Sequence, residues 1–241
     1  MASKVRLYVE HPLGEGQSVP LSREQAHYLF GVMRLAAGET VSLINGVDGE
    51  WDAEVVEAGK KGGLLVSRHQ TAPLQMPPDL WLMFAPIRKE RTAFIVEKAV
   101  EMGAAGIMPV QTAYAQSANR IRRDKLQAHA VEAAEQCGGT YVPPVDDLAK
   151  LDKVLAEWPD GRHLMFCDEA ISGRSAALPS ILAAPCAILI GPEGGFSPAE
   201  RDMLRRATFA HPVSLGPRIL RADTAAVAAL TLWQQAFGDW Q

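Results

Sequence analysis

The sequence predicts an α/β domain with a mostly parallel sheet, preceded by a small β-barrel. Three observations indicate this architecture: strand-like segments separated by Gly and Asp turns over residues 4–70, a proline-rich stretch after them, and then a regular alternation of apolar strands and amphipathic helices. The chain has 241 residues, of which 48% are hydrophobic and 22% charged, so it is long enough for two cores of ordinary globular composition.

The first segment is β-rich. We expect strands at Val5–Val9, Thr40–Ile44, Trp51–Val56 and Leu64–Ser67, with turns such as Asn45-Gly46 and Asp48-Gly49 between them. One helix interrupts these strands. It is expected to run from Glu24 to Met33 with Ser22 as N-cap, and its inward face to carry Ala26, Leu29, Phe30 and Met33.

A linker is expected at Thr71–Pro78, because its three prolines disfavour helix and remove donors from any strand ladder. We therefore divide the chain into residues 1–72 and residues 73–241.

Beyond the linker the pattern alternates. We expect strands at Leu80–Ala85, Gly106–Val110, His163–Cys167, Cys186–Ile190 and Pro212–Leu215, and helices at Glu90–Met102, at Asp124–Gln136, from a Ser197–Glu200 capping box onward, and from Asp223 to about Phe237. The helix before Gly103 should turn Phe94, Ile95, Ala99 and Met102 inward. The last helix is apolar nearly all round, so it lies either in the core or against a second subunit.

Composition excludes several classes of protein. The net charge is −4, so any nucleic-acid site must be a local basic patch. Three cysteines (Cys137, Cys167 and Cys186) are too few and too scattered for a disulfide framework or a zinc site, and we expect buried thiols in a reducing cytoplasm. The histidines lack metal-ligand spacing, and no apolar stretch is long enough to span a membrane, so we expect neither a metal nor a membrane partner.

Two glycine-rich loops stand at the carboxyl ends of predicted strands, where open α/β sheets bind ligands. They are Ile190–Phe196 and Leu215–Thr224. Neither has the spacing of a dinucleotide fingerprint or a phosphate loop, and each alone could be a tight turn. As a pair they could hold a flat heterocycle between backbone and apolar side chains. Arg221 stands beside a helix N-terminus, a position that favours anions.

Basic residues cluster at two places, Arg88 to Arg91 and Arg120 to Lys125. Such runs are commonly solvated faces. Because both follow predicted strands, contact with RNA phosphates is an equally good interpretation.

Five motifs resemble the ribosomal RNA small subunit methyltransferase E family. They are His27–Arg34 followed by Gly38-Glu39, Val96–Gly103 with its Lys98 and Glu101, Glu132–Gln136, Gly191–Ser197, and Leu215–Ala225. The resemblance implies a SPOUT-type methyltransferase domain with a C-terminal trefoil knot in residues 73–241, an RNA-binding PUA-like barrel in residues 1–72, and a cytoplasmic homodimer. It further implies methyl transfer from S-adenosylmethionine to N3 of a uridine in 16S rRNA of the small ribosomal subunit, at the site called uracil 1498.

The resemblance also assigns site residues. The cofactor would be held by Leu189, Gly191, Pro192, Glu193, Gly194, Gly195, Leu215, Gly216, Ile219, Leu220, Arg221 and Thr224. The RNA would contact Arg34, Arg88, Lys89, Arg91, Lys98, Arg120, Arg122 and Arg123.

Chemistry at N3 requires a proton acceptor, because the N3 lone pair becomes available only when its proton leaves. Arg221 is our candidate cation for the charge that spreads onto O2 and O4, and either Glu193 or Asp223 would take the proton. The alternatives are a related SPOUT methyltransferase acting on another rRNA or tRNA position, a catalytically silent RNA-binding dimer, and a small-nucleotide-binding protein without an RNA partner.

Overall fold

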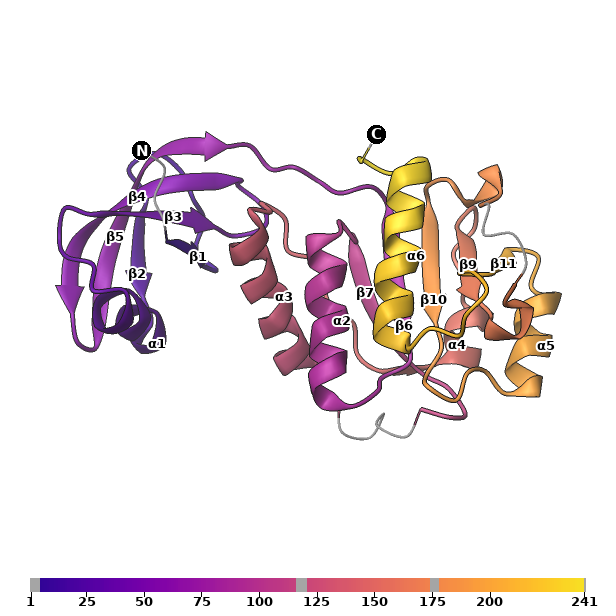
Figure 1. Ribbon diagram of the computed structural model, residues 1–241. Coiled ribbons are helices and arrows are strands. Elements are labelled where there is room, and N and C mark those ends of the chain that lie inside the picture. The colour runs from indigo at the N-terminus through magenta and orange to yellow at the C-terminus, as the bar shows by residue number, and fades with distance from the viewer. Residues whose placement is uncertain (1–4, 116–120, 174–177, 241) are drawn as a thin grey trace. The chain divides into compact units, whose positions relative to one another are not determined.

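The computed structural model describes residues 5–115, 121–173 and 178–240 (Figure 1). The chain forms two compact units. The first comprises Met1–Met76 with the later segment Ala134–Val142, and the second comprises Pro77–Ala133 with Pro143–Gln241.

The first unit is built on a five-stranded sheet in the order β1-β3-β4-β5-β2. Its strands are β1 (Arg6–Tyr8), β2 (Ser18–Leu21), β3 (Thr40–Ile44), β4 (Glu50–Gly59) and β5 (Gly62–Ala72). β1 pairs in parallel with β3, and the other neighbours are antiparallel. Four of these strands confirm the predicted positions. β2 was not predicted. It is a four-residue edge strand that contains Pro20, and proline is tolerated at a sheet edge but seldom found inside a sheet.

The predicted helix at residues 24–33 consists of two parts. A short α1 (Arg23–Ala26) is capped by Ser22, whose side chain accepts a hydrogen bond from the Gln25 amide. A π-helix (His27–Val32) continues it, and the Met33 amide donates to the Tyr28 carbonyl. The wider winding rotates the apolar face, so Met33 is 40% exposed and its predicted inward position is wrong. Leu29 remains fully buried in the core of this unit.

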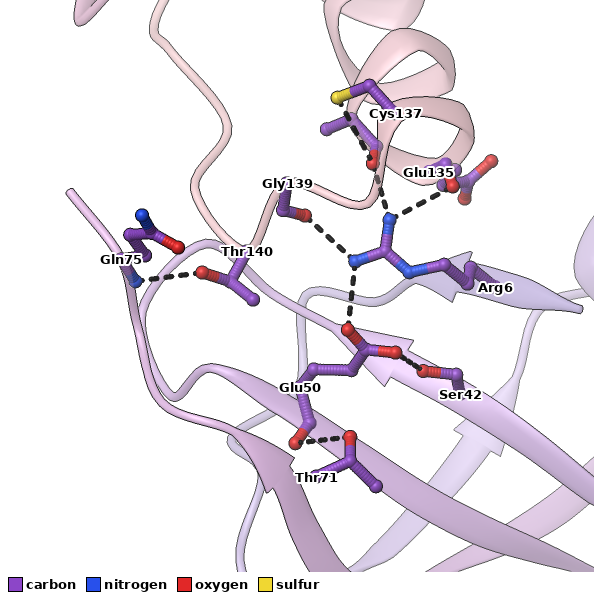
Figure 2. A network of polar contacts seen from close by, with 10 residues as sticks. Arg6, Ser42, Glu50, Thr71, Gln75, Glu135, Cys137, Gly139 and Thr140 are labelled. Atoms are coloured by element: carbon purple, nitrogen blue, oxygen red, sulfur yellow. Dashed lines mark hydrogen bonds and ion pairs between the residues drawn. The ribbon is translucent and has the colours of Figure 1, made fainter. Parts of the chain in front are cut away.

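Arg6 fastens the segment 134–142 to the sheet of the first unit (Figure 2). Its Nη1 donates to the carbonyls of Ala134 (2.6 Å) and Glu135 (3.0 Å), at the C-terminal end of α3 (Arg123–Cys137). Its Nη2 donates to the Gly139 carbonyl at 2.9 Å and forms an ion pair with Glu50 at 3.2 Å. A cation at a helix C-terminus satisfies carbonyls that no longer have helical partners.

The second unit contains a six-stranded sheet in the order β11-β9-β10-β6-β7-β8. Every neighbouring pair is parallel. The strands are β6 (Leu80–Phe84), β7 (Gly106–Gln111), β8 (Ala149–Lys150), β9 (His163–Cys167), β10 (Cys186–Ile190) and β11 (Ala210–Val213). The predicted parallel sheet is confirmed. β8 was missed because two residues carry no periodic pattern.

Four helices lie between or after the strands of this unit. They are α2 (Lys89–Glu101), α4 (Leu151–Ala156), α5 (Pro198–Arg206) and α6 (Ala222–Phe237). α2 packs beside α6 (Figure 1). The buried stripe of α2 is Thr92, Ile95, Val96, Ala99 and Val100. Phe94 lies off this stripe and is 39% exposed, with the Lys98 ammonium 5.4 Å from its ring centre, so its predicted inward position is wrong.

Helix α6 is a core element of the second unit. Trp233 is fully buried, and its indole N–H donates to the Leu182 carbonyl at 2.7 Å. Gln234 is also fully buried, and its amide donates to the Met102 carbonyl at 2.7 Å. Val227, Ala228 and Leu232 on other faces of the helix are half-buried.

The three thiols differ. Cys167 and Cys186 are buried as predicted, and burial raises the pKa of Cys186 to about 12. Cys137 is exposed, which corrects the expectation of three buried thiols, because it stands on the last turn of α3.

Within the described ranges, every helix is too short or too polar to cross a membrane.

Candidate functional site

A cavity opens at the carboxyl edge of the parallel sheet in the second unit. Its walls come from the segments that follow β9, β10 and β11 and from the first turn of α6. The lining residues are Cys167, Asp168, Glu169, Ser172, Ile190, Gly191, Pro192, Glu193, Gly194, Gly195, Val213, Leu215, Gly216, Arg218, Ile219, Leu220, Ala222 and Ala225. This edge is where ligands bind in open α/β sheets.

Most residues that the resemblance assigned to a cofactor meet at this cavity. The lining includes Gly191, Pro192, Glu193, Gly194, Gly195, Leu215, Gly216, Ile219 and Leu220. Leu189, Arg221 and Thr224 are not part of it. Leu189 is fully buried inside β10, while Arg221 and Thr224 are exposed at the start of α6.

The loop after β10 is shaped by its glycines. A β-carbon on Gly191 would come within 3.2 Å of the Phe196 ring, which is buried and packs edge-on against Phe166. Gly195 has a φ of +67°, and its amide donates to the Pro192 carbonyl at 2.8 Å. The next helix starts at once, since Ser197 and Glu200 form the predicted capping box of α5. The loop therefore brings bare backbone to the cavity wall.

Sequence reasoning missed the acidic wall of the cavity. The Asp168 side chain is fully buried and accepts bonds from Arg201 Nε (3.1 Å), Arg205 Nη2 (3.0 Å) and the Ala170 amide (3.1 Å). Glu169 pairs with Arg201 as well. Both carboxylates directly follow β9, and their place at a strand's carboxyl end was the signal that could have found them.

The cavity is chemically mixed. Apolar side chains from Ile190, Val213 and Leu215 stand beside the carboxylates of Glu169 and Glu193 and the bare glycine backbone. Such a lining suits a ligand that has a flat apolar ring at one end and positive charge at the other.

A second, more open hollow adjoins the cavity, and we name it the arginine groove. Its lining is Arg88, Arg91, Glu193, Ile219, Leu220 and Arg221. Arg91 Nη1 lies 3.1 Å from Glu193 Oε1, and Arg91 Nε lies 3.7 Å from Asp223 Oδ2. The groove thus gathers three arginines and one candidate proton acceptor, Glu193, and the other candidate, Asp223, lies beside it against Arg91.

The other residues predicted to contact RNA are not gathered there. Arg34 is exposed in the first unit, and its φ is +61°. Lys98 pairs with Glu101 at 2.6 Å, and Arg122 with Asp124 at 2.6 Å, a contact that lowers the pKa of Asp124. Lys89 is exposed, and Arg123 Nε donates to the Val145 carbonyl at 2.7 Å. Arg120 lies outside the described residues.

Across the described parts of the chain, no group of three or more His, Cys, Asp or Glu side chains is placed to hold a metal ion.

Comparison with known proteins gives consistent matches. Residues 75–234 match the family model of an RNA methyltransferase domain, and residues 21–66 match that of an RNA methyltransferase PUA domain. These matches and the parallel sheet confirm the predicted α/β class of the methyltransferase domain and the PUA-like domain that precedes it.

Relatives that match over most of this chain indicate the same family. A ribosomal RNA small subunit methyltransferase E from Mycobacterium bovis is 30% identical over 92% of this chain and 88% of its own length. Its counterpart from Rickettsia conorii is 26% identical over 93% of each chain. The crystal structure of the Neisseria gonorrhoeae enzyme of that name, bound to S-adenosyl methionine, superposes with a TM-score of 0.87 at 26% identity and covers 98% of this chain and 99% of that one. The chain belongs to the ribosomal RNA small subunit methyltransferase E family.

Proposed function

We propose that this chain methylates N3 of a uridine in 16S rRNA, at the site called uracil 1498, with S-adenosylmethionine as methyl donor. The observation that carries the proposal is the meeting of two hollows: a glycine-walled cavity with carboxylates, and a groove lined by three arginines. One suits a cationic, ring-bearing donor, and the other suits an anionic polynucleotide.

The cavity residues fit the cofactor. Gly191, Gly194 and Gly195 leave space that β-carbons would fill, so an adenine ring can approach the backbone closely. Leu215, Ile219 and Leu220 would supply apolar contacts to the ring, and Glu169 would face the positive charges. When bound, S-adenosylmethionine supplies a methyl group already activated by its sulfonium centre.

The protein's remaining task is to align the acceptor and remove its proton. Arg221 is the N-cap residue of α6 and lines the arginine groove, and it would stabilise the negative charge that reaches O2 and O4 of the uracil. Glu193 and Asp223 are the candidate proton acceptors. Arg88, Lys89 and Arg91 begin α2 at the same end of the sheet, where they would contact phosphates.

The wider assignment follows the family. Residues 1–72 would act as the RNA-binding PUA-like domain, with Arg34 among its contacts, and residues 73–241 as the methyltransferase domain with a trefoil knot. The protein would work in the cytoplasm as a homodimer on the small ribosomal subunit. Half-buried Val227, Ala228 and Leu232 of α6 offer apolar surface for a second copy.

Reverse transcription tests the proposal, because a methyl group on N3 blocks the Watson–Crick edge of uracil and stops the polymerase. Free 16S rRNA and assembled small subunits are each incubated with the protein and S-adenosylmethionine. We expect one cofactor-dependent stop, adjacent to uracil 1498. Stops elsewhere would favour a related methyltransferase, and a failure to bind the cofactor in calorimetry would favour the silent RNA-binding dimer.

A further inference from the structure

The cavity and the arginine groove share three lining residues, Glu193, Ile219 and Leu220. Two of these are apolar. Glu193 is therefore the one titratable group that borders both hollows within the described residues, and its side chain is 52% exposed. A group that takes a proton from the acceptor while the methyl arrives has to stand at this boundary.

Asp223 occupies a different position. It lines neither hollow, and its side chain is 21% exposed. Its Oδ1 accepts a bond from the Thr224 amide at 3.0 Å, on the first turn of α6, while Oδ2 faces Arg91. The carboxylate is thus fixed to the helix and turned toward the arginine.

Arg91 connects the two acids. It projects from α2, and its guanidinium lies 3.1 Å from Glu193 through Nη1 and 3.7 Å from Asp223 through Nε. Three elements meet in this row: α6 supplies Asp223, α2 supplies Arg91, and the loop after β10 supplies Glu193. A planar guanidinium holds two partners in fixed directions, which a lysine ammonium does not.

We propose that Glu193 accepts the N3 proton and that Arg91 and Asp223 are positioning residues for it. The inference rests on the proposed function. In the step, the N3–H bond breaks and leaves its electron pair on N3, while the proton passes to a Glu193 oxygen. N3 then forms its bond to the methyl carbon as the carbon–sulfur bond breaks and its electrons return to sulfur.

This assignment removes Arg91 from the phosphate contacts and leaves that role in the groove to Arg88, since Arg221 is assigned to the uracil oxygens. Arg88 is the matched comparison, because it is exposed, lines the same groove and has no ion pair within the described parts of the chain. The other charged side chains around Glu193 in the two hollows are Arg218, Arg221, Asp168 and Glu169.

The test is steady-state methylation of 16S rRNA by wild type and by Glu193→Gln, Asp223→Asn, Arg91→Lys, Arg91→Ala and Arg88→Ala. For each we would determine kcat, KM for RNA, the pH profile of kcat and, by calorimetry, cofactor affinity.

We expect Glu193→Gln to lower kcat about 100-fold or more, as loss of a general base does, with KM and cofactor affinity within about twofold. Asp223→Asn and Arg91→Ala should lower kcat about tenfold, move the acid limb of the pH profile, and leave KM unchanged. Arg91→Lys should recover part of the loss, while Arg88→Ala should raise KM and weaken its dependence on salt.

Three results would overturn the inference: full kcat in Glu193→Gln, a larger loss in Asp223→Asn than in Glu193→Gln, or an Arg91→Ala effect confined to KM and salt dependence. If Arg91→Ala does not fold, Arg91→Lys and Asp223→Asn give the same comparison. Failure of the wild type to methylate N3 of uridine would instead overturn the proposed function, so the two failures are distinguishable.

Discussion

The carboxylate of Glu169 occupies the space that a β-carbon on Gly195 would need. Gly195 also has a φ of +67°, a backbone conformation that side chains with a β-carbon rarely adopt. Glu169 cannot simply turn away, because Arg201 holds it. The geometry of the cavity wall therefore requires a residue without a β-carbon at position 195.

Gly195→Ala should distort this wall. The left-handed backbone alone costs about 1–2 kcal/mol, and the displaced carboxylate adds to that cost. We expect a lower melting temperature and at least a roughly tenfold loss of affinity for S-adenosylmethionine in calorimetry. Gly14→Ala, where nothing lies within 4 Å of the added carbon, is the control and should change neither quantity. Unchanged affinity in Gly195→Ala would contradict the described cavity.

Asp168→Asn tests the buried acid beneath the same cavity. The substitution leaves Arg201 and Arg205 without their buried charge partner, which typically costs about 3–5 kcal/mol. Because Arg205 is 47% exposed, water can replace part of its contact, and we expect the lower end of that range. Urea unfolding measures the loss. Asp160→Asn, at an exposed position, is the matched control. An equal loss of stability in both variants would contradict a stabilising role of the buried ion pairs of Asp168.

The variant Arg221→Ala distinguishes the function of the arginine groove from that of the cavity. Arg221 lines the arginine groove but not the cavity, so its loss should lower turnover without changing cofactor binding. We expect kcat to fall about 100-fold, as when one donor to a developing oxyanion is removed. Calorimetry with S-adenosylmethionine should give the wild-type affinity. Parallel losses in turnover and cofactor affinity would show that Arg221 holds the cofactor instead.

Thiol reactivity should distinguish the three cysteines. Thiolates are the reactive form, and burial raises the pKa of Cys167 and Cys186. A chromogenic disulfide reagent should therefore modify exposed Cys137 rapidly in the native protein, and the other two thiols only in urea. The rapid phase should vanish in Cys137→Ala. Its persistence would mean that a buried thiol is accessible.

The pair His163 and His211 should make stability depend on pH. Their facing ring nitrogens are 3.2 Å apart, and desolvation together with the neighbouring His163 lowers the pKa of His211. The folded state therefore binds fewer protons than the unfolded state, so stability rises with pH and falls as pH drops below about 6.5.

Urea midpoints between about pH 5 and pH 8 check this prediction for wild type, His211→Gln and the exposed control His11→Gln. The acid-side loss should be smaller in His211→Gln and unchanged in His11→Gln. Identical slopes for wild type and His211→Gln would be inconsistent with the expected direction.

Regular elements were predictable from the sequence because their patterns are local. The strands His163–Cys167 and Cys186–Ile190 and the capping box at Ser197 occur where the sequence places them. Elements that depend on contacts with residues far away in the sequence could not be predicted in this way. The segment 134–142 joins the first unit through Arg6, a contact between residues more than a hundred positions apart. The π-helix His27–Val32 was likewise not predicted, since the spacing of its apolar residues is that of an α-helix.

The candidate site shows the same division. Its two glycine loops could be found from sequence, since each adjoins a recognisable strand. The contact of Arg91 with Glu193 and Asp223 could not, because it needs the crossing order of the strands and helices that brings them together. Its place in a basic cluster after a strand therefore predicted a phosphate contact for Arg91, whereas its contacts with Glu193 and Asp223 support the positioning role proposed above.

Identification of the methylated nucleoside tests the central claim most directly. The purified protein is incubated with 16S rRNA and S-adenosylmethionine carrying an isotopically labelled methyl group, and the RNA is digested to nucleosides and analysed by mass spectrometry. The account predicts label in 3-methyluridine at close to one methyl group per 16S rRNA. Label in any other nucleoside, or none at all under conditions where the cofactor binds, would contradict it.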